Sequence, residues 1–308
     1  EWIGSDSARR EGISRPSTTF WKDAIGRLMK NKVAVVCFFI IVLLILSCII
    51  VPFFSPFESR EQHLGEVNKG FMTVCTDSRY EGQHHVHYFG TDNLGRDLFL
   101  RAFEGGRVSL MIAFAAVFVN LIVGLIYGGI SGYIGGAVDT IMMRIVEIVN
   151  GIPYLIVVIL LMMVLPKGIF TMVVAYGITG WTGMARLVRG QVLQLKSQEY
   201  IVAAEAMGAK SSRIIAKHLI PNALSVIIIN VTLAIPSAIF TEAFLSYIGL
   251  GVPVPQPSWG VLAKGGQDVF MTYPYQLVVP AVAISLTMLS FNLLGDGLRD
   301  AFDPRLRR

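Results

Sequence analysis

The sequence is poor in charge. Only 15% of its 308 residues are Asp, Glu, Lys or Arg, whereas soluble proteins contain about 25%, and 54% are hydrophobic, with a mean hydropathy of +0.61. This composition excludes an ordinary soluble domain and predicts an all-α integral membrane protein. The net charge is +5, but the basic residues lie beside apolar runs, where they encode membrane orientation. We therefore expect membrane lipid, and not nucleic acid, as a partner.

Cysteine is equally scarce. Two of the three cysteines lie in the first apolar run and Cys75 stands alone in a loop, so neither a disulfide framework nor a zinc-binding spacing can be built. His84, His85 and His87 are nearly adjacent in the same loop. Three neighbouring histidines without a Cys or carboxylate nearby in the sequence do not enclose one ion. We expect a solvated turn there and no metal.

Several enzyme motifs are absent. The sequence has no G-x-x-x-x-G-K-[ST] phosphate loop, so the chain is not expected to bind ATP in that way. It also lacks H-E-x-x-H and G-x-S-x-G, which leaves little support for a membrane hydrolase. We expect no enzyme activity and no cofactor in this chain, and any energy source must be another chain.

Six apolar runs are present instead. Residues 33–51 form an uninterrupted run close to the length of about 20 residues that crosses the hydrocarbon core. A cleaved signal peptide would have a shorter apolar segment and a small-residue cleavage site. The other runs cover residues 108–134, 141–165, 169–181, 223–245 and 277–294. We predict six transmembrane helices.

The runs divide the chain into segments. Residues 1–32 are predicted to be a cytoplasmic tail with an amphipathic helix along the membrane surface, and residues 295–308 a second cytoplasmic tail. Residues 52–107 are polar and slightly acidic, and form an extracytoplasmic loop domain. Residues 108–294 form the membrane core with spans two to six, and residues 252–273 form an external loop.

The distribution of Lys and Arg predicts the orientation. Seven precede the first span, six lie around residues 199–221 and four lie in the C-terminal tail. The external loops hold eight, but six of these are in the long first loop, whose length weakens its influence. Both termini are therefore predicted to be cytoplasmic, in a multi-pass protein.

Residues 199–221 form a basic island between apolar spans. We predict a short helix over residues 200–207, a left-handed stop at Gly208, a second helical turn over residues 212–218, and Pro221 at the opening of the next span. The result is a helix-turn-helix that protrudes from the bilayer. Its small and basic residues suit a groove on a second protein: Ala203, Ala204, Ala206, Lys210, Arg213 and Lys217.

A few polar residues lie within the spans. Arg144, Glu147 and Asn150 follow one another at steps of three and form a stripe that must face protein or water. Two interpretations remain open for them: an internal Arg144–Glu147 ion pair near the cytoplasmic end, or the lining of a gate or pathway. Glu242, near the outer end of the fifth span, is expected to line the mouth or to be interfacial.

Four glycines recur at intervals of four residues in the second apolar run. Gly124, Gly128, Gly132 and Gly136 lie on one helix face, where another helix can approach backbone to backbone. The partner helix could belong to this chain or to another subunit.

Three segments resemble permease subunits of ABC importers. The basic island is similar to their cytoplasmic loop E-A-A, three residues, Gly, nine residues, I-x-L-P, with Gly208 and Pro221 at the required spacing. Ala203 and Ala204 take the two Ala positions, and Glu205 is suggested to replace a charge missing at Val202. The loop also departs from the pattern at His218 and Ile220.

The other two segments flank the membrane core. Residues 89–97 closely resemble F-G-T-D-x-x-G-R-D, which precedes the second span of peptide importer permeases. Its glycine and Asx residues favour tight turns. Residues 295–305 look like the G-D-x-L-R-D-x-L-D-P-R ending of C-type permeases of oligopeptide and dipeptide importers. The motif positions before the second span are Gly90, Thr91, Asp92, Gly95, Arg96 and Asp97.

The resemblance implies a type I ABC importer permease fold in a bacterial cell membrane. It also implies pairing with a related second permease, two ATPase subunits that bind ATP and Mg and grip the basic islands, an extracytoplasmic peptide-binding protein, and a peptide substrate. The ATPase-coupling residues that it implies are Tyr200, Ala203, Ala204, Glu205, Gly208, Lys210, Arg213 and Pro221.

Other functions remain as alternatives. Related importers carry nickel complexes or other small solutes. An ion-coupled secondary carrier should show an internal repeat and broken helices, and no repeat is visible. A membrane enzyme or sensor would need a nucleophile with a base, or a metal set, and the spans contain neither.

Overall fold

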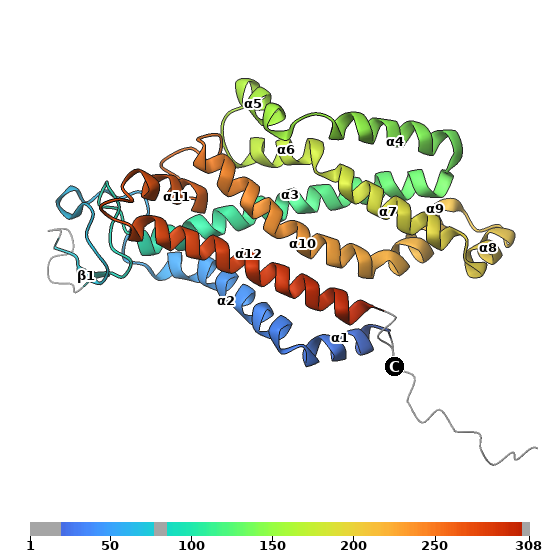
Figure 1. Ribbon diagram of the computed structural model, residues 1–308, viewed down its shortest axis with the longest axis horizontal. Coiled ribbons are helices and arrows are strands. Elements are labelled where there is room, and N and C mark those ends of the chain that lie inside the picture. The colour runs from blue at the N-terminus through green and yellow to red at the C-terminus, as the bar shows by residue number, and fades with distance from the viewer. Residues whose placement is uncertain (1–19, 77–84, 304–308) are drawn as a thin grey trace, which may run out of the picture.

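Long helices run side by side along the length of the molecule (Figure 1). The computed structural model describes residues 20–76 and 85–303. At one end lies a small domain that contains the short antiparallel strands β1 (Thr73–Val74) and β2 (Val86–His87) and the short 3₁₀ turn η2 (Leu64–Glu66). At the other end lie the short helices α8 (Glu199–Ala206) and α9 (Ser211–Ile214). The all-α membrane architecture is confirmed.

The N-terminal helix α1 (Phe20–Lys30) lies against the last helix, α12 (Tyr275–Phe302). Ala24 of α1 is buried beside Phe302, and the Trp21 ring meets the Phe302 ring edge-on at 5.6 Å between centroids. Ile25 and Met29 are exposed. The first span, α2 (Lys32–Phe54), follows after Asn31 caps its first turn.

The second span, α3 (Leu98–Ile134), begins ten residues before the predicted start at residue 108. Asp97 caps it by accepting a hydrogen bond of 2.7 Å from the Leu100 N–H. The sequence prediction followed the uninterrupted apolar run and therefore missed the first turns, which carry Arg101, Glu104 and Arg107 and pack against the small domain. The last ten residues of the predicted loop domain, residues 98–107, are thus helical.

The glycine face of α3 packs inside this chain, against α7 (Trp181–Lys196). A Cβ atom on Gly128 would lie 2.3 Å from the Ala185 carbonyl oxygen, and one on Gly132 would lie 2.9 Å from that of Arg189. A Cβ atom on Gly124 would lie 2.6 Å from the Cβ atom of Met184. Gly136, in contrast, lies beyond α3, at the first residue of the next helix, with a positive φ of 58°.

The predicted third span over residues 141–165 is not a continuous helix. It consists of α4 (Gly136–Asn150) and α5 (Tyr154–Val164), which are bent by 77°. Pro153 causes the break, because it has no N–H to donate and disfavours helical backbone at the residue before it. Helix α6 (Ile169–Thr179) follows and is separated from α7 by Gly180.

The last long helices are α10 (Ile220–Tyr247) and α12. Between them the predicted external loop contains α11 (Trp259–Asp268), capped by Ser258. Trp259 is buried and donates from Nε1 to the Ala102 carbonyl at 2.9 Å, which fixes α11 to α3. Helix α12 extends into the predicted C-terminal tail as far as Phe302, and a glycine at 297 lets it approach Ala34 of α2.

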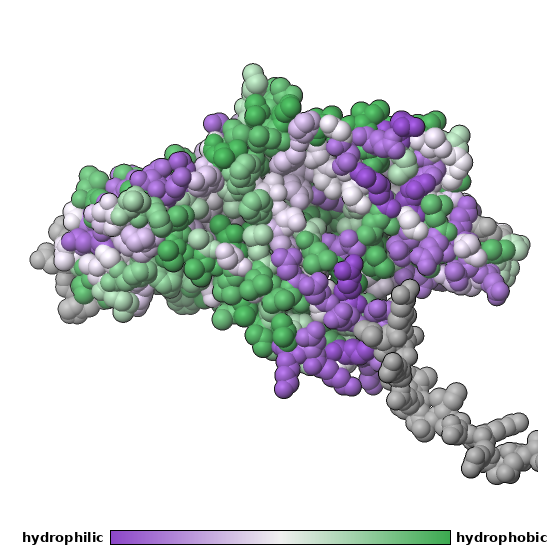
Figure 2. All heavy atoms as spheres, viewed as in Figure 1, coloured by the Kyte–Doolittle hydropathy of each residue, from purple (hydrophilic) through white to green (hydrophobic). Residues whose placement is uncertain are grey.

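Four helices are long and apolar enough to cross a membrane, namely α2, α3, α10 with the turn before it, and α12. The bent pair α4 and α5 makes a fifth candidate, and α6 is a shorter apolar helix. Figure 2 shows hydrophobic residues over α5 and over the middle of the molecule, with hydrophilic residues concentrated toward the α8 end. The predicted count of six spans depends on joining α6 to α7 and stays a prediction.

Candidate functional site

The basic island folds into a helical hairpin, which we define as α8, the turn at residues 207–210, and α9. Gly208 has a φ of +80°, in the left-handed region that favours glycine, as the sequence predicts. The Met207 N–H donates to the Ala203 carbonyl at 3.0 Å and the Ala209 N–H donates to that of Ala204 at 3.1 Å. These bonds close the end of α8 and reverse the chain.

Three fully buried side chains hold the hairpin against the membrane helices. Ile201, Ile214 and Leu219 are each 0% exposed and pack in one cluster with Val188 and Val192 of α7. The cluster continues into Ala223 and Ile227 of α10. Displacement of the hairpin must therefore carry α7 and α10 with it.

The outer face of the hairpin differs from the predicted docking surface in one residue. Ala203, Lys210, Arg213 and Pro221 are exposed as expected, but Ala204 is only 7% exposed and faces inward. Ala203 and Ala204 face different directions because adjacent residues of an α-helix point about 100° apart, so one can be exposed while the other is buried. The side chain of Glu205 lies outside the described part of the structure.

Sequence reasoning missed Met207, which is 82% exposed at the tip of α8. Tyr200, Ala203 and Met207 lie at positions i, i+3 and i+7, so they share one helix face. That spacing was visible in the sequence. Together these three residues form a small apolar surface at the free end of the hairpin.

The second half of the island does not end at residue 218 as predicted. Helix α9 continues through a π-helical turn, Ile215–Leu219, directly into α10. The Ile220 N–H reaches the carbonyl of Ile215, five residues back. Pro221 explains the wide turn, because its ring would clash with the carbonyl four residues before it in a regular helix. The second helix of the hairpin and the span thus form one continuous helix over residues 211–247.

An ion pair that the sequence did not reveal joins α7 to α4. Arg189 donates from Nε to one carboxylate oxygen of Asp139 and from Nη2 to the other, each at 2.5 Å. The Ser131 hydroxyl of α3 also donates to Asp139. Near the end of α7, Lys196 donates to the Tyr133 carbonyl at 2.7 Å. Three helices are thus tied together beside the hairpin.

The polar stripe on α4 is present, and its first two residues form a pair. Arg144 donates to Glu147 at 2.7 Å, and the two side chains are 72% and 59% exposed. Asn150 accepts a hydrogen bond of 3.3 Å from the Thr182 hydroxyl. The Arg144–Glu147 ion pair that the sequence suggested is therefore present, and its side chains are exposed on the surface of this chain.

Glu242 lies apart from this stripe. It is 2% exposed and accepts a hydrogen bond of 2.8 Å from the Ser246 hydroxyl one turn later on α10. Both expected positions, lining the mouth or at the interface, require exposure. The structure places Glu242 in the interior, because α11 packs against the outer part of α10.

The motif before the second span builds a tight turn around Asp92. Its carboxylate accepts hydrogen bonds from the N–H groups of Leu94 and Arg96, at 2.9 and 3.0 Å, and from Arg96 Nε at 2.7 Å. Gly90 and Gly95 have positive φ values of 76° and 72°. A Cβ on Gly95 would lie 2.0 Å from the His63 carbonyl oxygen, so the turn fits closely against η2.

Two further motif residues connect this turn to its surroundings. The Thr91 hydroxyl accepts from the Lys69 N–H at 2.8 Å and donates to the Glu66 carbonyl at 2.5 Å. Asp97, besides capping α3, lies 2.7 Å from Nδ1 of His87. The predicted role of the motif residues as turn formers is therefore visible in their hydrogen bonds.

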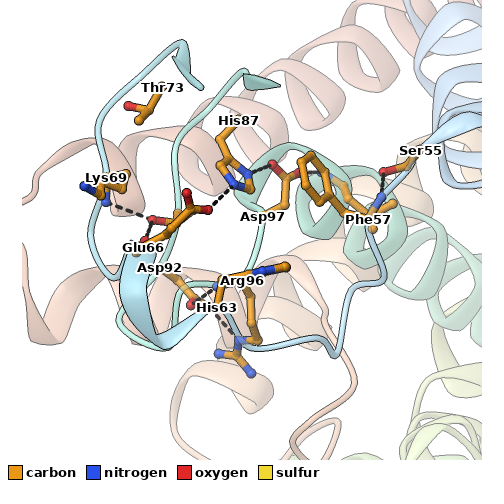
Figure 3. A network of polar contacts seen from close by, with 12 residues as sticks. Ser55, Phe57, His63, Glu66, Lys69, Thr73, His87, Asp92, Arg96 and Asp97 are labelled. Carbon is orange, nitrogen blue, oxygen red and sulfur yellow. Dashed lines mark hydrogen bonds and ion pairs between the residues drawn. The ribbon is translucent and has the colours of Figure 1, made fainter. Parts of the chain in front are cut away.

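The expected solvated turn is wrong for His87. Its ring is fully buried, stacks on Phe57 at 4.5 Å between centroids, and lies between two carboxylates (Figure 3). Nε2 is 3.0 Å from Glu66, opposite Asp97 on Nδ1. His85 meets Phe57 edge-on, and His84 lies outside the described residues. The carboxylates, remote in sequence, were not predictable from the histidine cluster.

Charge in this group is balanced by hydrogen bonds. Burial opposes the charged ring, but the hydrogen bond and negative charge of Asp97, followed by those of Glu66, raise the pKa of His87 above its ordinary value. Burial likewise opposes a charged Glu66, yet hydrogen bonds from Thr76 and His87 hold the pKa of that carboxyl below its ordinary value. The group is therefore a buried row in which the His87 ring lies between two carboxylates.

Known families match the chain over most of its length. Residues 120–308, which include the hairpin and the C-terminal motif, match the family described as "Binding-protein-dependent transport system inner membrane component". The chain belongs to this family. Residues 19–70 match "N-terminal TM domain of oligopeptide transport permease C". The resemblance stated from the sequence is confirmed, and the chain is a multi-pass membrane permease subunit.

Full-length relatives carry the same description. The oligopeptide transport system permease protein OppC of Bacillus subtilis (strain 168) is 50% identical over 308 residues, which cover 100% of this chain and 97% of that protein. The dipeptide transport system permease protein DppC of the same strain is 48% identical and covers 97% of this chain and 90% of that protein. OppC of Escherichia coli (strain K12) is 43% identical, and the match covers 96% of this chain and 95% of that protein.

The fold of the permease is that of type I ABC importers. A chain of the inward-facing MetNI methionine ABC transporter superposes with a TM-score of 0.54 at 20% identity, covering 65% of this chain and 96% of that chain. At this identity the similarity concerns the fold alone. A permease of this family works in general with a partner permease, ATPases and a binding protein.

Proposed function

We propose that this permease carries oligopeptides or dipeptides into a bacterial cell as half of the pathway of an ATP-driven importer. The observation that carries the proposal is the 50% identity to an oligopeptide permease over the whole chain, with the hairpin, the motif before α3 and the end of α12 in the same order. The peptide substrate follows from the relatives' names, because the residues of this chain do not by themselves specify a peptide.

The assembly contains two different permeases, two ATPase subunits and an extracytoplasmic peptide-binding protein. The exposed Arg144–Glu147 pair on α4 supports a second permease, since charged side chains of a membrane helix need protein or water beside them. ATP and Mg bind to the ATPases, and this chain holds no cofactor and catalyses no reaction. Delivery of peptide by the binding protein selects the substrate.

We assign six spans with both termini in the cytoplasm. The spans are α2, α3, α4 with α5, α6 with α7, α10 and α12. The lysines and arginines gathered around the hairpin and the two termini support this orientation. It places the hairpin in the cytoplasm with the ATPases, and the domain that contains β1 and β2 outside.

The hairpin couples ATP hydrolysis to transport. Closure of the ATPases presses on the apolar surface of Tyr200, Ala203 and Met207, and Lys210 and Arg213 meet acidic residues around the groove. The buried cluster beneath the hairpin passes this movement to α7 and α10, and the Asp139–Arg189 pair passes it to α4. The pathway between the two permeases then opens alternately to each side.

A cleft of about 720 Å³ at the outer end supports entry of a polar solute there. Charged residues of both signs line it, among them Asp92, Arg96, Lys167 and Lys264. A peptide carries both a positive and a negative terminus, so such a lining suits it.

Native mass spectrometry of the chain, purified gently from its own membrane, tests the assembly. We expect one related permease and two ATPase chains with each copy. In vesicles loaded with peptide-binding protein, uptake of a labelled peptide should stop when ATP is removed. A chain found alone, with uptake that survives ATP depletion, would indicate an ion-coupled carrier. An intact assembly that takes up a nickel complex and no peptide would retain the importer and reject the substrate.

A further inference from the structure

A buried imidazole, carboxylate and thiol meet beneath the motif turn. His63 and Glu66 are each 1% exposed and Cys75 is 7% exposed. One ligand atom from each residue, a ring nitrogen, a carboxylate oxygen and the sulfur, lies within 4.8 Å of the other two. These three residues stand outside the transport machinery described above.

The backbone fixes the three donors before any ligand arrives. His63 and Glu66 stand at the two ends of η2, where the Glu66 N–H donates to the His63 carbonyl at 2.8 Å. Cys75 directly follows β1, and its N–H donates to the His85 carbonyl at 2.8 Å. The glycine at position 95 allows the motif turn to pack directly on the backbone of His63.

We propose that His63, Glu66 and Cys75 form a binding site for a divalent transition metal of the zinc type. Imidazole, carboxylate and thiolate are the protein ligands that Zn²⁺ binds. Hard cations such as Mg²⁺ or Ca²⁺ bind oxygen ligands and do not favour a sulfur ligand. Bonds of about 2.0–2.3 Å put two tetrahedral ligands about 3.3–3.8 Å apart. Small side-chain movements bring the three atoms to that spacing.

The surroundings resemble the outer layer of a metal site. Metal ligands are usually oriented by hydrogen bonds from a second set of residues. Here Glu66 accepts hydrogen bonds from the Thr76 N–H and hydroxyl on one oxygen, and the other oxygen faces His87. His87 is in turn held by Asp97 and by the stacked ring of Phe57, as Figure 3 shows.

Metal binding releases one proton from the site. The Cys75 thiol donates a hydrogen bond to Glu66 in this structure. When the metal binds, the S–H proton of Cys75 passes to solvent and the sulfur bonds to the metal as thiolate. The Glu66 oxygen that had accepted the hydrogen bond from Cys75 then coordinates the same ion. One thiolate and one carboxylate balance the two positive charges, and His63 binds as the neutral ring. A water completes the tetrahedron.

The bound metal would connect segments that no covalent bond joins. It would link η2 to the end of β1, and through Glu66, His87 and Asp97 to the first turn of α3. Such a link stabilises a small domain in which the described residues form two short strands. The proposal does not depend on which solute the permease carries.

Cobalt is the probe that tests the site. The complete importer is stripped with a chelator and titrated with Co²⁺, which absorbs in the near ultraviolet when thiolate binds it. We expect this absorption at one Co²⁺ per copy of this chain, its loss on adding Zn²⁺, and its absence in Cys75→Ser. The matched control is Cys48→Ser, which removes another buried thiol within α2 and should keep the absorption. Absorption that is missing in the unaltered importer, or that survives in Cys75→Ser, would overturn the proposal.

A second measurement uses the unaltered chain in case Cys75→Ser does not assemble. Thiol alkylation is followed by mass spectrometry in the intact importer under mild denaturant, with and without Zn²⁺. We expect Zn²⁺ to slow alkylation of Cys75 at least tenfold and to leave the rate at Cys48 unchanged. Equal rates at Cys75 with and without Zn²⁺ contradict the site. His87→Gln, which removes the orienting contact to Glu66, should weaken Zn²⁺ binding by about 10- to 100-fold.

Discussion

The guanidinium of Arg189 on α7 donates a hydrogen bond to each carboxylate oxygen of Asp139 on α4, both at 2.5 Å. Fifty residues separate the two in the sequence, and the helix that carries Asp139 is the one broken at Pro153. The pair therefore joins α7, the helix that precedes the hairpin, to α4, the first half of the broken span. In the proposed coupling, this contact would pass movement of α7 to α4.

Asp139→Asn should uncouple transport from ATP hydrolysis. The amide keeps the shape but loses the charge-assisted bidentate pair, each such bond being worth about 1.5–3 kcal/mol. We expect normal assembly with the ATPases and a severalfold lower uptake of peptide per ATP hydrolysed, measured in proteoliposomes. The exchanged pair Asp139→Arg with Arg189→Asp is the control and should recover part of the loss. Unchanged uptake per ATP in Asp139→Asn would show that the pair only stabilises the fold.

Gly208→Val should leave the protein in the membrane but abolish peptide-stimulated ATP hydrolysis. A β-branched side chain at a φ of +80° costs about 1–2 kcal/mol or more, so the turn of the hairpin opens. Gly190→Val is the matched control, because Gly190 has an ordinary φ and open space around its Cβ position. Stimulation that is equally strong in both variants would contradict the role of the turn.

Ala203→Arg should prevent the ATPases from co-purifying with the permease, with little change in the stability of the isolated chain. Ala203 is exposed on the face that includes Met207. Ala204→Arg should instead unfold the hairpin, because Ala204 is buried and Arg cannot be accommodated. A thermal unfolding curve distinguishes the two: it shifts for Ala204→Arg only. ATPase retained on Ala203→Arg would place the docking surface elsewhere.

Gly128→Ala should lower the unfolding free energy by about 1–3 kcal/mol, since the added methyl meets the Ala185 carbonyl and forces α3 from α7. Gly129→Ala is the neighbouring control. Its nearest contact is Ile215 Cγ2 at an ordinary 3.8 Å. Thermal aggregation in detergent measures both variants, and we expect a lower transition temperature for Gly128→Ala alone. Equal transitions would mean that the helices relax around the methyl.

The sequence predicts the existence of the long apolar helices well, because an apolar run marks each of them. It predicts helix breaks, helix starts and burial poorly where these depend on residues that are distant in the sequence. Pro153 carried the signal for the break, but the apolar run across it suggested one span. The start of α3 depends on the Asp97 cap, which lies outside the apolar run. Burial of His87 depends on Glu66 and Asp97, 21 and 10 residues away. Such contacts leave no periodicity in the sequence.

The hairpin turn shows the opposite case. Gly208 and Pro221 act through the local backbone, so their roles follow from residue type alone. The inward direction of Ala204 and the exposure of Met207 required the helix to be placed against Ile214 and Leu219. Local rules thus predicted the shape of this site, and tertiary packing decided which of its residues face a partner.

The π turn at Ile215–Leu219 leaves no joint between the hairpin and the outer side of the membrane. The helix that runs from Ile215 to Tyr247 has 33 residues, a length of roughly 50 Å at about 1.5 Å per residue. A tilt of about 5° at the cytoplasmic end would move the opposite end by about 4 Å. Glu242 and Ser246 lie near that end, beneath α11. In the proposed importer, this continuous helix would carry an ångström-scale push on the ATPase side toward the side where the solute enters, and Pro236 is a position inside α10 that has no N–H to donate.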